Sequence, residues 1–478
     1  MVCEVRARRS TLVPTGRHRN AESHESRAAH WRARWGVQVE FTHDGSGETG
    51  LGCAVCHGRR GGKALTRFPK SSNAEGTYMS ATSKASGSNE IRPFTIETSQ
   101  ADLDDLRARI NATRWPEKET VEDLSEGPRL ATMQALARYW GSDYDWRKCE
   151  AKLKALDHFI TEIDGLDIHF IHVRSKHENA LPLIVTHGWP GSIIEQMKII
   201  DPLTNPTAHG GSEADAFHLV IPSMPGYGYS GKPTKTGWGP DHVARAWVEL
   251  MQRLGYTRYV ASGGDWGGQI TDLMGAQAPA GLIGIHTNFP GAVRSDVATA
   301  VQTGAPAPSG LDDEESRLYE KLKEFFTTDV FYALEMATHP QALYGIADSP
   351  IGLAAWLLDH DATSLALISR VFEGKSEGLS RDDILDNITY YWLTNTGISS
   401  GRLYRENKFG FFDAKGVSIP AAVSIFPDEL YQVPRSWAEQ AYPNLIHYNK
   451  LDKGGHFAAW EQPQLFSEEV RTGFRSLR

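Results

Sequence analysis

The stretch Ser262-Gly263-Gly264-Asp265-Trp266-Gly267-Gly268, near the middle of the chain, contains the pattern Gly-x-Asp-x-Gly. It matches the nucleophile elbow Gly-x-Ser-x-Gly, in which a strand turns sharply into a helix and projects one side chain outward. Residues 259–262 (YVAS) are typical of a short buried strand, and a helix is predicted from Gln269 onward. Apolar residues ahead of the strand recur at helical spacing, at Val243, Trp247, Leu250, Met251 and Leu254. The order helix, strand, elbow, helix is the one that the motif requires.

The elbow presents Asp265 where the usual pattern presents serine. A carboxylate is already ionised at neutral pH, so it can attack carbon without a base to remove its proton. Its natural target is a saturated carbon that bears a leaving group. Attack there forms an ester on the protein, and water must then cleave that ester with the help of a general base.

An oxyanion hole is predicted from the loop that follows residues 181–186 (LPLIVT), an apolar run that reads as a buried strand. The loop itself is 187–192 (HGWPGS). In folds with this elbow, such a loop supplies one backbone N–H and the residue after the nucleophile supplies the other. We assign these two donors to Trp189 and Trp266.

The general base is predicted to be His456, which lies in the glycine-flanked stretch 454–457 (GGHF) close to the C-terminus. Such a base needs a carboxylate that holds its tautomer and stabilises the imidazolium. Glu429, 27 residues earlier, fits the chain order nucleophile, acid, base of α/β-hydrolases, and Asp428 competes for the same role.

Taken together, the motifs from residue 91 to the end resemble the microsomal-type epoxide hydrolases. The matching segments are 114–116 (RWP), 144–147 (YDWR), 163–166 (IDGL), 168–172 (IHFIH), 187–192 (HGWPGS), 222–230 (PSMPGYGYS), 265–268 (DWGG), 352–356 (GLAAW) and 454–459 (GGHFAA). The resemblance implies an α/β-hydrolase fold, with a mostly parallel central sheet flanked by helices, an N-terminal lasso-like helical segment and an inserted helical cap. The implied limits are 91–157 for the N-terminal segment, 158–300 and 405–478 for the core, and 301–404 for the cap.

The resemblance also implies two cap tyrosines that hydrogen-bond the epoxide oxygen, and the matching positions are Tyr332 and Tyr404. Ring opening develops an alkoxide, which a neutral phenol can stabilise and protonate. The implied reaction converts an epoxide and water into a vicinal diol without a metal or organic cofactor. Detoxification or aromatic hydrocarbon catabolism is the expected setting.

Four aromatic residues are candidates to line the substrate pocket, with Trp356 and Trp392 taken as the substrate-binding pair beside Trp238 and Phe326. Each of the four can equally be ordinary core. Two other functions stay open. A haloalkane-type dehalogenase would use the same Asp265, His456 and acid with indole or amide donors for the halide, and a non-catalytic epoxide-binding protein would bind without turnover.

Composition favours an enzyme with a full hydrophobic core, since 40% of the 478 residues are apolar and 23% are charged. A formal net charge of −9 argues against a nucleic-acid partner. No stretch approaches the roughly 18 apolar residues that span a membrane, so we expect no membrane anchor and a cytoplasmic location. Self-association into a homo-oligomer stays open.

The first 90 residues are rich in Arg, Ser, Gly and His, and we expect them to be a disordered or artefactual extension, with Met79 as an alternative start. Within them, Cys53-x-x-Cys56-His57 fits a c-type haem attachment pattern. Because no export signal or second axial ligand is visible nearby, we interpret it as a chance match. One Cys pair with a single His is also short of a four-ligand zinc site.

Three local signals predict element boundaries. Ser99 with Asp102 indicates a helix start, followed by the apolar face Leu103, Leu106 and Ile110. Asp164-Gly165, between the runs 158–163 and 166–173, indicates a β-hairpin. A further core strand is predicted at about 421–426.

Overall fold

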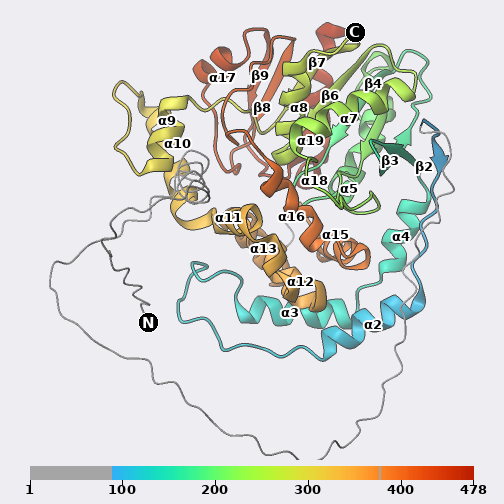
Figure 1. Cartoon of the computed structure of the whole chain (residues 1–478), viewed down its shortest axis with the longest axis vertical. Coiled ribbons are helices and arrows are strands. Elements are labelled where there is room, and N and C mark those ends of the chain that lie inside the picture. Colours follow the sequence, from blue (N-terminus) through green and yellow to red (C-terminus); the bar gives the residue numbers. More distant parts are fainter. Residues whose placement is uncertain (1–88, 376–377) are drawn as a thin grey trace, which may run out of the picture.

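The computed structural model describes residues 89–375 and 378–478 (Figure 1). The extension predicted for residues 1–90, apart from its last two residues, and the Cys53, Cys56 and His57 motif lie outside this part of the chain. The predicted domain limits stay predictions.

One nine-stranded sheet forms the centre of the molecule, in the spatial order β1-β2-β3-β5-β4-β6-β7-β8-β9. The first three strands are antiparallel, and the six from β5 to β9 run parallel to one another. The predicted mostly parallel sheet is therefore confirmed. The strands are β1 (Arg92–Pro93), β2 (His158–Ile163), β3 (Leu166–Val173), β4 (Leu181–Thr186), β5 (Phe217–Pro222), β6 (Tyr259–Gly263), β7 (Leu282–Thr287), β8 (Ala421–Ile425) and β9 (Leu445–Lys450).

The hairpin predicted at Asp164-Gly165 is confirmed, because β2 and β3 pair from Ile163↔Leu166 onward. Both turn residues have positive φ, 51° at Asp164 and 78° at Gly165. That is the backbone requirement of a two-residue type I′ turn, which Asp-Gly meets at low cost.

The core helices follow the strands that they cover. α7 and α8 pack against each other and α8 lies on β6 and β7, whereas α6 and α19 pack together and contact β5 and β8 respectively. These helices are α5 (Ile193–Gln196), α6 (Ile200–Thr204), α7 (Pro240–Arg253), α8 (Asp265–Gln277), α17 (Arg435–Ala441), α18 (Ala458–Glu461) and α19 (Pro463–Gly473).

The N-terminal segment contributes α2 (Gln100–Asn111), α3 (Leu130–Ser142) and α4 (Trp146–Lys154). The predicted start of α2 is confirmed: the Ser99 hydroxyl accepts the Asp102 N–H at 3.0 Å, and Leu103, Leu106 and Ile110 are buried. This cap satisfies one of the amide donors that a helix start leaves free.

Eight α-helices lie between β7 and β8 in the described part of the chain and form the cap. They are α9 (Ser295–Thr303), α10 (Asp313–Glu324), α11 (Phe331–Thr338), α12 (Tyr344–Asp348), α13 (Pro350–Leu358), α14 (Ala362–Phe372), α15 (Arg381–Thr394) and α16 (Gly397–Glu406). A π-helical turn, Phe325–Asp329, joins α10 to α11. In Figure 1 the cap helices α11, α12 and α13 lie between the sheet and the N-terminal helices α2 and α3, which contact α13.

In the part of the chain that the structure covers, none of the helices combines the length and the apolar character that crossing a bilayer would require.

Candidate active site

Asp265 opens α8 directly after β6, with a positive φ of 49°. A non-glycine residue in this region is strained, and such strain persists where the surroundings fix it. The turn needs glycine on both sides, because a Cβ on Gly263 would collide with the backbone of Gly267 and one on Gly267 with the Thr186 carbonyl. The carboxylate is only 4% exposed and projects at the carboxyl end of the parallel strands.

One oxygen of that carboxylate is held by the loop after β4. The Trp189 N–H donates to Asp265 Oδ1 at 2.7 Å. Gly188 allows this approach, because a Cβ at that position would lie 2.5 Å from the Cβ of Asp265. The Trp266 N–H belongs to the first turn of α8, where backbone donors have no partner within the helix. The two predicted oxyanion donors therefore flank the nucleophile position.

Hydrogen bonds from the cap fix the loop that carries Trp189. Asn387 and Tyr391 of α15 donate to the carbonyls of Pro190 (2.8 Å) and Gly191 (2.7 Å). Ser192 also donates to Asn387 Oδ1 at 2.7 Å. Because α15 belongs to the cap, cap packing and the position of the Trp189 donor are coupled.

His456 lies beside the other oxygen of the Asp265 carboxylate. Its Nε2 is 3.6 Å from Asp265 Oδ2, and its Nδ1 lies 2.5 Å from Glu429 Oε1. Both His456 and Glu429 are buried, at 3% and 1% exposure. Burial alone would lower the pKa of His456, but the charges and hydrogen bonds of Glu429 and Asp265 raise it well above its ordinary value.

The neighbouring residue Asp428 is exposed, and its backbone N–H donates to the Gly454 carbonyl at 3.1 Å. Lys321 of the cap helix α10 donates to the Glu429 carbonyl at 2.5 Å. Of the two acids considered from the sequence, Glu429 is the one that the structure brings to His456.

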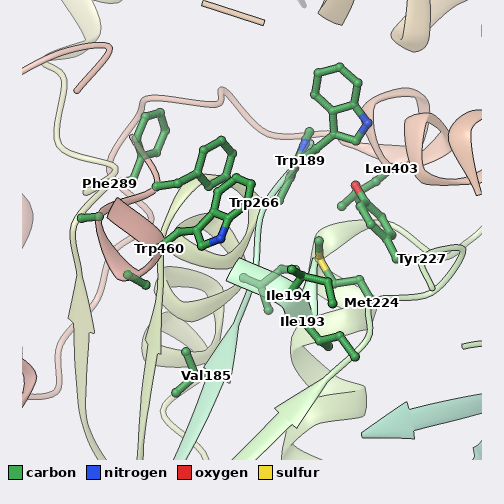
Figure 2. Packing of buried hydrophobic residues seen from close by; sticks show 14 of the residues in the cluster. Val185, Trp189, Ile193, Ile194, Met224, Tyr227, Trp266, Phe289, Leu403 and Trp460 are labelled. Carbon is green, nitrogen blue, oxygen red and sulfur yellow. The ribbon is translucent and has the colours of Figure 1, made fainter. Parts of the chain in front are cut away.

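The two cap tyrosines face the tryptophans of the oxyanion loop and the elbow. Tyr332 stacks on Trp189 with ring centroids 5.0 Å apart, and Tyr404 meets Trp266 edge to face at 4.8 Å. Their own rings are 6.0 Å apart. Figure 2 shows Trp189 and Trp266 among the buried apolar side chains of this region, together with Tyr227.

The surroundings keep both phenols neutral. Burial, followed by the charge of Asp265, raises the pKa of Tyr332 well above its ordinary value. Burial, followed by Tyr332 and then Asp265, does the same for the pKa of Tyr404. Neutral phenols beside a carboxylate can donate hydrogen bonds or a proton to an oxygen that becomes negative.

A cavity opens beside the two tyrosines, and about 30 Å³ of it is open to the centre of a water molecule. Its other walls are mostly aromatic and apolar, formed by Phe325, Phe326, Val330, Ala333, Phe409, Phe411, Phe412, Leu430 and Gln302.

Phe326 was among the expected lining residues. Trp356 and Trp392 do not line this cavity. Trp392 instead packs against the Arg109 guanidinium, which lies 5.7 Å from the centroid of its ring. Trp238 lines a separate open groove.

Sequence reasoning missed two further groups around His456. Glu195 and Gln196 of α5 are 5% and 3% exposed and line a small second cavity with His456. Their signal in the sequence is a pair of adjacent polar residues, Glu195 and Gln196, in the mostly apolar run 193–200 (IIEQMKII), six residues after Trp189. Within the residues that the structure describes, no group of three or more His, Cys, Asp or Glu side chains is arranged to hold a metal.

Comparison with known proteins adds independent information. Residues 91–196 match the model of the epoxide hydrolase N terminus, and residues 182–313 match that of the alpha/beta hydrolase fold. The chain is 48% identical to the "Putative epoxide hydrolase" of Stigmatella aurantiaca (strain DW4/3-1), over 81% of this chain and 86% of that protein. It is 35% identical to epoxide hydrolase 1 of Oryctolagus cuniculus, over 80% and 88% of the two chains.

A solved structure is also similar. The juvenile hormone epoxide hydrolase of the silkworm Bombyx mori superposes with a TM-score of 0.71 at 30% identity, covering 81% of this chain and 95% of that one. Family models, relatives and structure agree with the resemblance expected from the motifs: the chain belongs to the epoxide hydrolase family and has the α/β-hydrolase fold.

Proposed function

We propose that the chain hydrolyses epoxides to vicinal diols through a covalent ester on Asp265. The observation that carries this proposal is the environment of one carboxylate: Trp189 donates to Oδ1, and His456 stands 3.6 Å from Oδ2 with Glu429 behind it. The family to which the chain belongs supports the same reaction. A cytoplasmic location and a role in detoxification or aromatic hydrocarbon catabolism stay predictions from the sequence.

In the first step the epoxide lies between Asp265 and the phenols of Tyr332 and Tyr404. Asp265 Oδ2, which is not engaged by the Trp189 N–H, attacks a ring carbon, and the bond between that carbon and the epoxide oxygen breaks. A phenol gives its proton to the leaving oxygen. The product is a hydroxyalkyl ester whose carbonyl oxygen, the former Oδ1, already accepts the Trp189 N–H.

In the second step water attacks Cγ of the ester and gives one proton to His456 Nε2. The oxyanion that forms is stabilised by the backbone N–H groups of Trp189 and Trp266. The bond between Cγ and the substrate oxygen then breaks, and that oxygen takes the proton from His456. The second proton of the water remains on the carboxyl group of Asp265. Asp265 then gives this proton to the phenolate, which restores the neutral phenol.

A single turnover in H₂¹⁸O tests the ester directly. With enzyme in excess over a styrene-type epoxide, attack on the ester places ¹⁸O in the side chain of Asp265, so the peptide that contains it gains 2 Da. The His456→Ala variant should instead hold the intact ester, visible as the added mass of one substrate, while the exposed-histidine control His339→Ala should turn over normally. Label found only in the diol, with no adduct on the variant, would refute the proposal.

One observation supports the dehalogenase alternative. In the described part of the chain the indole Nε1 atoms of Trp189 and Trp266 are buried without a hydrogen-bond partner, and such donors can stabilise a halide. Incubation with 1-chlorobutane and a halide assay separates the two activities, because epoxide hydrolysis releases no halide. Non-catalytic binding of an epoxide would leave the substrate unchanged.

A further inference from the structure

A second, smaller cavity lies next to the triad and is separate from the one that the tyrosines line. It is formed by the elbow (Gly263, Gly264), by α5 (Glu195, Gln196) and by His456, and its remaining lining residues are Val185, Asn288, Phe457, Ala458, Ala459 and Phe466. The space open to the centre of a water molecule is about 10 Å³. That is roughly the room that a single buried water needs.

Glu195 and Gln196, which line this cavity, each carry a buried polar atom that lacks a hydrogen-bond partner among the described residues. These atoms are Oε2 of Glu195 and Oε1 of Gln196, although the Gln196 amide donates to Glu195 Oε1 at 2.6 Å. Buried polar atoms in folded proteins are nearly always paired, and ordered water is the usual partner where the protein supplies none. A cavity of one-water size with two free acceptor positions therefore fits a water molecule.

Glu195 is electrostatically part of the active site. Burial, followed by the charge of Asp265, raises its pKa to about 8, and His456 opposes this shift. The side chain is consequently a neutral carboxylic acid at pH 7. Such a group can donate through its O–H as well as accept, and it does not compete with Asp265 or Glu429 for the imidazolium.

We propose that Glu195 and Gln196 hold the hydrolytic water in this cavity beside His456. The inference rests on the proposed ester mechanism and adds the source of its second reactant. The water oxygen forms the bond to Cγ of Asp265, one of its protons passes to His456 Nε2, and the bond from Cγ to the substrate oxygen breaks. Because the water has its own cavity, a bulky epoxide in the cap cavity does not have to leave room for it.

Separate measurement of the two half-reactions tests this assignment. Rapid-quench mass spectrometry follows ester formation and ester decay in the parent protein and in Glu195→Leu, Glu195→Gln and Gln196→Met. We expect ester formation within twofold of the parent, and ester decay at least tenfold slower in Glu195→Leu, with the ester accumulating. Glu195→Gln retains a donor and an acceptor for water, so it should recover part of the decay rate.

Asp386→Asn serves as a matched control, because Asp386 is another buried carboxyl group with a raised pKa that lies outside both cavities. Ester decay at the parent rate in all three variants would overturn the inference, as would an equal slowing of both half-reactions, which indicates only a packing defect. If Glu195→Leu does not fold, the rates of ester formation and ester decay are compared with the parent in Glu195→Gln and Gln196→Met instead. Failure of the ester mechanism itself is distinguishable, since His456→Ala would then form no adduct.

Discussion

His456 Nε2 stands 3.6 Å from Asp265 Oδ2 while its Nδ1 contacts Glu429 Oε1 at 2.5 Å, so one buried imidazole is shared by two carboxylates. Both raise the pKa of His456. In the proposed mechanism, ester formation neutralises only Asp265. The nucleophile thereby stops stabilising the imidazolium at the moment when the reaction needs a neutral base, and Glu429 alone remains to orient the ring.

Replacing Glu429 by Gln should impair the second half-reaction most. The amide cannot stabilise the imidazolium that forms as water loses its proton, so we expect ester decay to fall by roughly 10²-fold or more, as for the orienting acid of other triads. Asp428→Asn, which changes the adjacent exposed carboxylate, should remain close to the parent. Rapid-quench mass spectrometry of both variants makes the measurement, and equal effects would remove Glu429 from the role.

The cap tyrosines should affect the opposite half-reaction. Loss of a phenol that protonates the leaving oxygen is expected to slow ester formation by about 10²-fold in Tyr404→Phe or Tyr332→Phe, within the usual range of general acid catalysis. Ester decay should change little. Tyr344→Phe is the control, because Tyr344 is 67% exposed. An unaltered rate of ester formation in both single variants would contradict the proposed proton donation.

Gly188→Ala should disable the site without unfolding the protein. The new Cβ would lie 2.5 Å from the Asp265 Cβ and 2.6 Å from its Oδ1, so the carboxylate must leave the Trp189 N–H. We expect kcat/KM to fall by at least about 10²-fold, the usual cost of losing an oxyanion donor. Gly345→Ala, where a Cβ has open space, provides the comparison. Parent-like kcat/KM in Gly188→Ala would show that the carboxylate does not depend on this geometry.

The aromatic wall of the cap cavity should contribute to substrate binding. Phe326 lines this cavity and packs edge to face on Phe412 with centroids 5.7 Å apart. Phe326→Ala should lower kcat/KM for aryl epoxides by about fivefold, which corresponds to one lost aromatic contact of roughly 1 kcal/mol. Phe331→Ala, at a 61% exposed position, is the control. A smaller effect than in a parallel Trp356→Phe variant would instead support Trp356 as the binding residue.

A buried carboxyl group in the cap predicts a pH-dependent stability. Burial raises the pKa of Asp386 to about 6 from its ordinary value of 3.8. The folded state therefore holds this proton more tightly than the unfolded state, and the contribution of Asp386 to stability falls as the pH rises from about 4 to 6. Asn cannot ionise but can still accept from the Tyr144 hydroxyl, which donates to Asp386 at 2.8 Å.

Relative to the parent, Asp386→Asn should accordingly gain roughly 2 kcal/mol in free energy of unfolding between pH 4 and pH 7.5. Urea unfolding at the two pH values measures the difference. The exposed neighbour Asp143→Asn should show no comparable change with pH. A constant difference between Asp386→Asn and the parent would mean that Asp386 titrates normally in the folded protein.

The elbow could be predicted from the sequence because its chemistry is local. Gly263 and Gly267 are required by backbone contacts within a few residues, and the hairpin at Asp164-Gly165 follows from turn geometry in the same way. The choice between Asp428 and Glu429 could not be derived locally. It depends on a backbone pairing between Asp428 and the His456 loop, which turns one neighbouring carboxylate outward and the other inward.

Residues that act through tertiary packing left a weaker signal. Glu195 is one of two charged residues, with Lys198, in a mostly apolar run, and only the structure shows that it lines a small cavity together with His456. The phenylalanines of the cap cavity come from two segments far apart in the chain, residues 325–326 and 409–412. No local pattern indicates that such segments converge, so of this group only Phe326 was anticipated.

The cap interrupts the sheet between β7 and β8, so the nucleophile precedes the cap in the chain whereas Glu429 and His456 follow it. During synthesis on the ribosome, His456 is added 191 residues after Asp265 (456 − 265). At the usual rate of translation this takes roughly 10 to 40 s. In the proposed mechanism a nascent chain therefore carries the carboxylate and both phenols before it has a base, and it can acquire turnover only once the last parallel strands have paired.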